Sequence, residues 1–443
     1  FVKGVLPGEA KVTVSAGGWD GRTDNPGVVP AADPVLRSAS EITFGNDAVA
    51  STVDRQADTR FYGDGRVEAA AGSHRLSARA YGERNRTDAR YGSWLGLNEI
   101  TADATQRLIG GAELQDTLAT GWPGAVEVTA GGGWRQEHVV ADEQTEDRGG
   151  TELSALPRAH VWMSTWSGFV ESAARPWGPL TAAVGGRLDH HSYFGNVANP
   201  HAGLALAAGP AVFRMSAGTT FAAPTAGDLA PRYGGNPDLK PERGKTVEGG
   251  VEAKVGPFGA RLGGYGRWVT DQIEWAPDLM GAWAPRNVTK VATRGLEGGV
   301  SASRGWFRAD ANVTTIASFE QVPDGLGGLL PARRAAHVPT WSGGALVGVD
   351  LPTGTGVSLA ARGAGTRRMY TFDALFQPAT KRLAPYGVLT LRLSQKLAEG
   401  VEFYGGVENL ADTRYATHFG NTLYDGDYPA PGRNLFGGAS IRW

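Results

Sequence analysis

Two groups of side chains in the sequence are of the types that bind ligands. Asp189, His190, His191 and Tyr193 bring carboxylate, imidazole and phenol groups together at a strand end, and such donors could bind a metal chelate. The alternative is a polar and aromatic strand end at a membrane boundary, and we prefer it. Arg232 and Tyr233 have side chains of the kind that contacts small molecules. Two interpretations of this pair stay open, contact with a ligand and membership of the aromatic girdle of a membrane barrel.

Other chemical motifs are weaker. The acidic segment from Asp142 to Asp147 has the hard oxygen donors that Ca²⁺ prefers, but it lacks the glycine spacing of a calcium loop, so a solvated loop is preferred. Gly244-Lys245-Thr246 is similar to the end of a phosphate loop, yet Leu239 replaces the first glycine. Neither H-E-x-x-H nor G-x-S-x-G occurs. We therefore expect no enzyme, no cofactor and no metal site.

The elements that must position these residues are β-strands. From Phe307 to Phe319 one set of alternate residues is mostly apolar and the other is mostly polar: Phe307, Ala309, Ala311, Val313, Thr315, Ala317 and Phe319 against Arg308, Asp310, Asn312, Thr314, Ile316 and Ser318. A side-chain period of two gives a strand one apolar and one polar face. Runs of this kind occur from Lys11 to the end of the chain, and they predict eighteen strands.

The connections between these runs alternate between short and long. Short turns include Gly209-Pro210 and Pro352 to Gly356, whereas Asp142 to Gly150 and Ala226 to Pro241 are long and rich in Gly, Asp, Asn and Pro. Short turns at one end and long loops at the other are typical of an antiparallel transmembrane β-barrel in an outer membrane. We expect a single barrel domain over residues 1–443.

Composition agrees with a barrel and excludes other classes. The chain of 443 residues has no cysteine, a net charge of −2 and 41% hydrophobic residues. Because the net charge is close to zero, the chain has no excess of basic side chains to bind phosphates, and no nucleic-acid partner is expected. No apolar run is long enough for a transmembrane helix, but a barrel crosses lipid with alternating residues only.

Three separated segments carry a resemblance to a known family, the TonB-dependent outer-membrane receptors. The first contains Phe221-Ala-Ala-Pro224-Thr225 and an N-P-x-L-x-P-E loop, the second follows Asn409, and the third is the last strand. The residues that match the family motifs are Pro224, Asn236, Pro237, Leu239, Pro241 and Glu242, then Asn409, Leu410, Asp412 and Tyr415. In the last strand, Gly438, Ile441 and Trp443 fit the terminal assembly signal that is usual in outer-membrane barrels.

The resemblance implies a barrel of about 22 strands whose lumen is filled by a plug, of which this chain would supply about eighteen strands. Nothing in the sequence resembles the plug or the box that contacts TonB, so we expect them upstream or on a separate chain. The implied function is active uptake of a scarce nutrient, such as a ferric siderophore or a cobalamin, across the outer membrane of a Gram-negative-type bacterium.

The implied partners are outer-membrane lipid, the plug, the TonB complex acting through the plug, and a small-molecule ligand. Two alternatives stay open at this point. The first is a passive, porin-like diffusion channel, and the second is a structural or adhesive barrel at the cell surface.

Overall fold

The computed structural model describes most of the chain. The described residues are 2–6, 10–24, 55–92, 99–147, 150–156, 158–230, 235–277, 283–322, 328–373, 377–419 and 427–441. Within this part the chain is almost entirely strand, and no helix there is long and apolar enough to cross a membrane.

Long strands dominate both halves of the chain. The first half contains β1 (Val2–Leu6), β2 (Ala10–Asp24), β3 (Arg55–Ala71), β4 (His74–Gly92), β5 (Glu99–Ala119), β6 (Glu127–Asp147), the short β7 (Glu152–Ala155), β8 (Ala159–Trp177), β9 (Leu180–His191), β10 (Gly195–Ala208) and β11 (Ala211–Ala222). One short helix, α2 (Ala226–Leu229), follows β11.

The second half continues in the same way. It contains β12 (Glu242–Val255), β13 (Phe258–Pro277), β14 (Trp283–Arg304), β15 (Phe307–Gln321), β16 (Arg333–Arg334), β17 (Trp341–Asp350), β18 (Thr355–Ala364), β19 (Arg367–Phe372), β20 (Pro378–Leu383), β21 (Tyr386–Ala398), β22 (Val401–Glu408), β23 (Ala416–His418), β24 (Tyr428–Pro429) and β25 (Asn434–Ile441).

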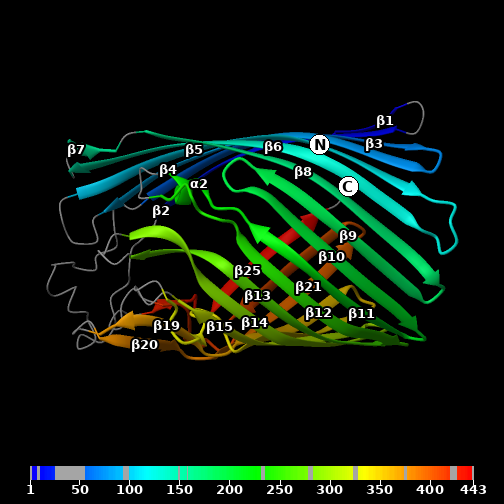
Figure 1. Cartoon of the computed structure of the whole chain (residues 1–443). Coiled ribbons are helices and arrows are strands. Elements are labelled where there is room, and N and C mark those ends of the chain that lie inside the picture. The colour runs from blue at the N-terminus through cyan, green and yellow to red at the C-terminus, as the bar shows by residue number, and fades with distance from the viewer. Residues whose placement is uncertain are drawn as a thin grey trace.

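The long strands form one antiparallel sheet in which each strand pairs with its neighbours in the sequence, and the sheet curves into a barrel of tilted strands (Figure 1). β19 pairs with β20, and β23 with β24, as separate hairpins. The main sheet ends at β1 and β25, and no pairing between these two strands occurs among the described residues. The predicted all-β transmembrane barrel is confirmed.

The pleat gives the sheet a polar inner face and an apolar outer face. Leu262, Leu296 and Val313 lie on the outer face, and all three are exposed. Asn312 points to the opposite side, where it lies beside Gly299 and Gly344. The strand register inferred from alternation is therefore confirmed.

All eighteen predicted strands are present, and the differences concern their lengths. β4 extends to Gly92 and β6 to Asp147, so most of the predicted Asp142 to Gly150 loop is part of a strand. The run predicted over 357–370 divides into β18 and β19. The alternation of short and long connections has an exception between β9 and β10, which are joined by residues 192–194 only.

Candidate ligand-binding site

A cavity of about 930 Å³ lies against the inner faces of β4–β9 and the segment that follows β11. Its lining combines guanidinium, carboxylate and aromatic groups: Tyr81, Arg107, Glu113, Arg135, Glu137, Phe169, Arg187, Asp189, His191, Phe221 and Pro224. Part of its depth comes from Gly133, where a Cβ atom would lie 3.1 Å from the carbonyl oxygen of Ala112. A side chain at this position would press on the neighbouring strand.

The charges in the cavity are arranged with carboxylates behind and guanidinium groups in front. Arg107 Nε donates to Glu137 Oε1 at 2.6 Å, and Arg135 Nη2 donates to Glu137 Oε2 at 2.8 Å. Arg187 contacts Asp189 in the same way at 2.9 Å. The carboxylate side chains of Glu137 and Asp189 are 10% and 2% exposed, whereas the three arginines are each more than 40% exposed.

This arrangement has a chemical consequence. Each buried carboxylate holds its arginines in a fixed orientation and keeps their remaining N–H donors directed at the lumen. The lining holds three guanidinium groups and, with Glu113, three carboxylates, so the oriented N–H donors and not a net charge distinguish this surface. Such donors are suited to the carboxylate, phosphate or catecholate oxygens of an anionic ligand.

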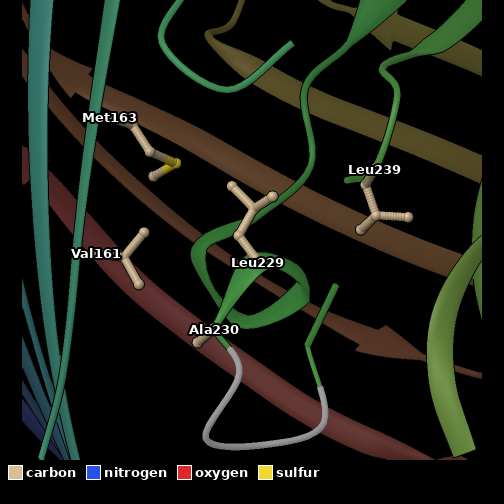
Figure 2. Close-up of a cluster of buried hydrophobic side chains, with 5 residues drawn as sticks. All are labelled: Val161, Met163, Leu229, Ala230 and Leu239. Atoms are coloured by element: carbon tan, nitrogen blue, oxygen red, sulfur yellow. The ribbon is translucent and has the colours of Figure 1, made fainter. Parts of the chain in front are cut away.

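One side of the cavity is lined by the described part of the connection between β11 and β12, which packs against the inner wall. Leu229 and Leu239 pack with Val161 and Met163 of β8, and all four side chains are buried (Figure 2). Ala230 completes this cluster. We call residues 223–230 and 235–241 the inner latch. The latch spans the inside of β9 and β10, because its ends belong to β11 and β12 while its apolar residues contact β8.

Capping contacts stabilise the helix of the latch. Thr225 is the N-cap of α2, and its hydroxyl accepts a hydrogen bond from the backbone N–H of Asp228. The Asp228 carboxylate accepts in return from the Thr225 backbone N–H, which completes a capping box. Pro224 is buried and lines the cavity.

The N-P-x-L-x-P-E residues anchor the returning half of the latch. Asn236 Nδ2 donates to the Pro285 carbonyl, and Leu239 is 2% exposed in the cluster. Glu242 Oε1 accepts from the backbone N–H of Ile273 at 2.9 Å. Pro237 is exposed and Pro241 buried. The matched residues in this loop thus make structural contacts.

Beside this anchor, β13 carries a half-buried carboxyl at its loop end. Burial, together with the negative charge of Glu320, raises the pKa of Glu274 above its ordinary value of 4.5. Glu242 adds to this effect, and Arg333 opposes it. Arg333 is itself hydrogen-bonded to Glu320 at 3.0 Å and lies over the Tyr370 ring.

The predicted group at the end of β9 is divided between two faces. His191 is 5% exposed, lines the cavity and stacks on Phe194 with ring centroids 4.2 Å apart. His190 points to the outer face, where its Nδ1 contacts Asn196 Oδ1 at 2.9 Å. Tyr193 lies in the turn and donates its backbone N–H to His191 Nδ1. The structure therefore does not bring His190 and His191 together.

Several other predicted residues can be located. Arg232, Tyr233 and Trp443 lie outside the described residues. Gly438 pairs with Tyr404, and Ile441 is exposed on the outer face opposite Val401.

The element after β22 is a tight turn. Asn409 and Asp412 have positive φ angles of 51° and 53°, a conformation that Asn and Asp tolerate better than other residues. Asn409 Nδ2 donates to the Thr413 and Pro431 carbonyls, and Asp412 Oδ1 accepts from the Arg433 N–H. Leu410 donates its backbone N–H to the Leu389 carbonyl.

Tyr415 completes this element. Its ring stacks on Tyr386 with centroids 4.4 Å apart, and its hydroxyl accepts from Arg362. Asn409 and Asp412 thus hold the segment that leads into β25, whereas Leu410 and Tyr415 contact β21.

Sequence reasoning missed the cavity arginines and their carboxylates. Arg107, Arg135 and Arg187 come from three strands whose adjacency is set by the barrel. Alternation places each of them on the polar face. Cross-strand pairing, read together with that alternation, is the signal that would have grouped them.

Curated relatives include two receptors for scarce nutrients. The chain is 29% identical over 267 residues to the vitamin B12 transporter BtuB of Vibrio vulnificus (strain YJ016), with 60% of this chain and 40% of that protein covered. It is 25% identical over 320 residues to the ferrienterobactin receptor of Escherichia coli (strain K12), covering 65% of this chain and 41% of the relative. The match thus spans less than half the length of each relative.

The solved structure of Pseudomonas aeruginosa FpvA bound to a heterologous pyoverdine has the same fold. The TM-score is 0.79 at 12% identity, with 99% of this chain and 63% of that chain covered. The family model described as TonB dependent receptor-like, beta-barrel, matches residues 7–410. Because this match covers most of the chain, the protein belongs to the family of TonB-dependent receptor β-barrels, whose members are receptors and transporters of Gram-negative outer membranes.

Proposed function

We propose that this chain is the barrel of an outer-membrane transporter that takes up a scarce nutrient with energy delivered through TonB. The single observation that carries the proposal is the lumenal cavity with its three oriented guanidinium groups. Relatives that transport vitamin B12 or bind ferric enterobactin support this function over a passive diffusion channel.

The ligand is a small molecule with anionic groups, of the size of a metal chelate or a cobalamin. Arg107, Arg135 and Arg187 supply the N–H donors to those groups, and His191 and Tyr193 lie at the outer end of the cavity. His190, on the outer face, is the weakest member of the predicted contact group. Arg232 and Tyr233 belong to the same connection as the latch, and the proposal assigns them to ligand capture from the loop side.

A plug and further strands complete the transporter. The main sheet has hydrogen-bonding edges at β1 and β25, and an unpaired strand edge in a bilayer is costly because its backbone groups have no water. These edges support strands and a plug on upstream sequence or on a companion chain. The TonB complex would act through that plug, and lipid would surround the outer face.

Uptake by whole cells tests this proposal. The native, full-length protein is expressed in an outer membrane that lacks related receptors, and cells are given radiolabelled cobalamin or ferric enterobactin. We expect accumulation of one ligand that stops when a protonophore or loss of TonB removes the energy supply, while surface binding persists. Uptake that continues without TonB and rises linearly with concentration would instead establish a passive channel.

A further inference from the structure

The outer surface of the barrel carries a row of cationic, imidazole and aromatic groups across the strands of the first half, most of them midway along their strands. Cross-strand pairing aligns one outward residue from each of five neighbouring strands: Phe61 with Arg84, Arg84 with Leu108, Leu108 with His138, and His138 with Trp162. We call this set the outer row. Phe61, Leu108 and Trp162 are exposed large apolar residues.

The height of the outer row follows from its neighbours. Two positions closer to the short turns, the outward residues of β6 and β8 are Gln136 and Ser164. Two positions further are Trp134 and Trp166, which pair with each other, and Trp166 also pairs with His190 of β9. Indole rings gather at the boundary between hydrocarbon and headgroups. The outer row therefore lies in the headgroup layer on the side of the long loops.

The polar groups of the outer row are available to a ligand. Arg84 is exposed, and its side chain makes a long hydrogen bond of 3.4 Å to Gln106. It forms no ion pair within the described part of the chain. His138 stacks on Trp162 with ring centroids 3.8 Å apart and planes 8° apart. One position further out, His160 Nδ1 lies 3.3 Å from His138 Nε2.

A neighbouring arginine shows what Arg84 lacks. Arg86 also faces outward, but the Asp88 carboxylate neutralises it through two hydrogen bonds of 2.7 and 2.8 Å. An exposed guanidinium without a carboxylate, beside imidazoles and flanked by apolar side chains, matches an amphiphile with an anionic head and hydrocarbon tails.

We propose that the outer row is a binding site for the phosphate-bearing headgroup of an outer-leaflet lipid. Arg84 donates to the phosphate oxygens, the imidazole of His138 supplies a further donor, and the Phe61, Leu108 and Trp162 side chains contact the first methylene groups of the chains. This inference rests on the proposed outer-membrane location, but it requires neither the nutrient nor TonB.

The test compares lipids that differ only in their headgroup. The full-length protein in nonionic detergent is titrated with dioleoyl phosphatidic acid or dioleoyl phosphatidylcholine, and bound lipid is counted by native mass spectrometry. We expect the wild-type protein to retain phosphatidic acid selectively and the double variant Arg84→Gln/His138→Gln to lose about tenfold of that affinity. Equal retention of the two lipids by the wild-type protein would overturn the proposal.

A matched variant controls for charge alone. Arg294→Gln removes an exposed arginine on the outer face of β14 and should leave the selectivity unchanged. Arg294 lies two residues from Ala292, which pairs with Trp268. An equal loss of affinity in this variant would show that any outward cation suffices, which contradicts a specific site.

Displacement of the lipid by millimolar inorganic phosphate would assign the outer row to free phosphate and would also contradict the proposal. Heat-dependent gel migration verifies that each variant is folded. Nutrient uptake is measured separately, so that failure of the lipid-binding proposal is distinguished from failure of the transport proposal.

Discussion

The inner faces of β4–β9 and of β12–β18 differ in how they hold charge. In the first, carboxylates such as Glu137 and Asp189 are buried behind arginines that border the cavity. In the second, the ion pair of Arg308 and Asp350 is more than half exposed, and glycines such as Gly250, Gly299 and Gly344 occupy inward positions of the strands. We refer to them as the charged wall and the glycine wall.

The difference follows from what covers each wall. The inner latch packs on the charged wall through Leu229 and Leu239, which excludes water from part of it and allows carboxylates to be buried with their partners. The latch also reaches the loop end of the glycine wall, where Ile273 packs against the same cluster and Asn236 donates to Pro285. The Arg308–Asp350 pair, close to the short turns, remains solvated. The comparison supports the proposal that the ligand binds at the charged wall, where buried carboxylates orient the arginines.

The largest expected effect is at the latch. Leu229→Ala should destabilise the contact between latch and charged wall by about 2–5 kcal/mol, because Leu229 is 1% exposed and its removal leaves a cavity. Hydrogen exchange at the Leu229 and Ala230 amides would measure this change. Leu204→Ala, at an exposed site on the outer face, is the matched control and should leave latch exchange unchanged.

The next effect distinguishes the two faces of the glycine wall. Val313→Arg should lower the yield of folded barrel, since arginine on the lipid face costs about 2–4 kcal/mol at the bilayer midplane. Asn312→Arg should fold, because this neighbour points into the lumen beside Gly299 and Gly344. Heat-dependent gel migration after reconstitution compares the variants. Equal yields of folded barrel with arginine at either position would show that the assignment of these residues to the lipid and lumen faces is shifted by one residue.

Much of this pattern could be predicted from the sequence. Alternation and turn signals located the eighteen predicted strands, and alternation gave the polar side of runs such as Phe307 to Phe319, although many strands extend further than predicted. The Asn409 turn and the loop around Asn236 were located by their motifs. The grouping of Arg107, Arg135 and Arg187 could not be predicted, because it depends on which strands become neighbours and how far each is staggered. The opposite orientations of His190 and His191 do follow from alternation.

A third prediction compares the ion pairs of the two walls. Glu137→Gln should destabilise the barrel by about 1.5–3 kcal/mol, because the buried carboxylate accepts charge-assisted hydrogen bonds from two arginines. Asp350→Asn removes an exposed partner and should cost only about 0–1 kcal/mol. Unfolding by urea in detergent micelles measures both. A larger loss at Asp350 would remove the distinction between the walls.

The smallest effect is a pH dependence at the loop end of β13. Because the pKa of Glu274 is raised in the folded protein, the folded state binds more protons than the unfolded one from about pH 4.5 upward, and stability falls as the pH rises through that window. Glu274→Gln should abolish this contribution and raise the midpoint of thermal unfolding at pH 7. An unchanged pH profile in the variant would show that Glu274 is not the titrating group.

Ligand capture by variants of the two walls tests the central assignment most directly. Equilibrium binding of the nutrient identified by the uptake assay is measured for the full-length protein carrying Arg135→Gln, Arg187→Gln or, from the glycine wall, Arg308→Gln. The charged-wall variants should each lose about tenfold in affinity, because each removes a charge-assisted contact, and Arg308→Gln should bind like the wild-type protein. Equal affinities in all three variants, or a loss confined to Arg308→Gln, would contradict the assignment of ligand binding to the charged wall.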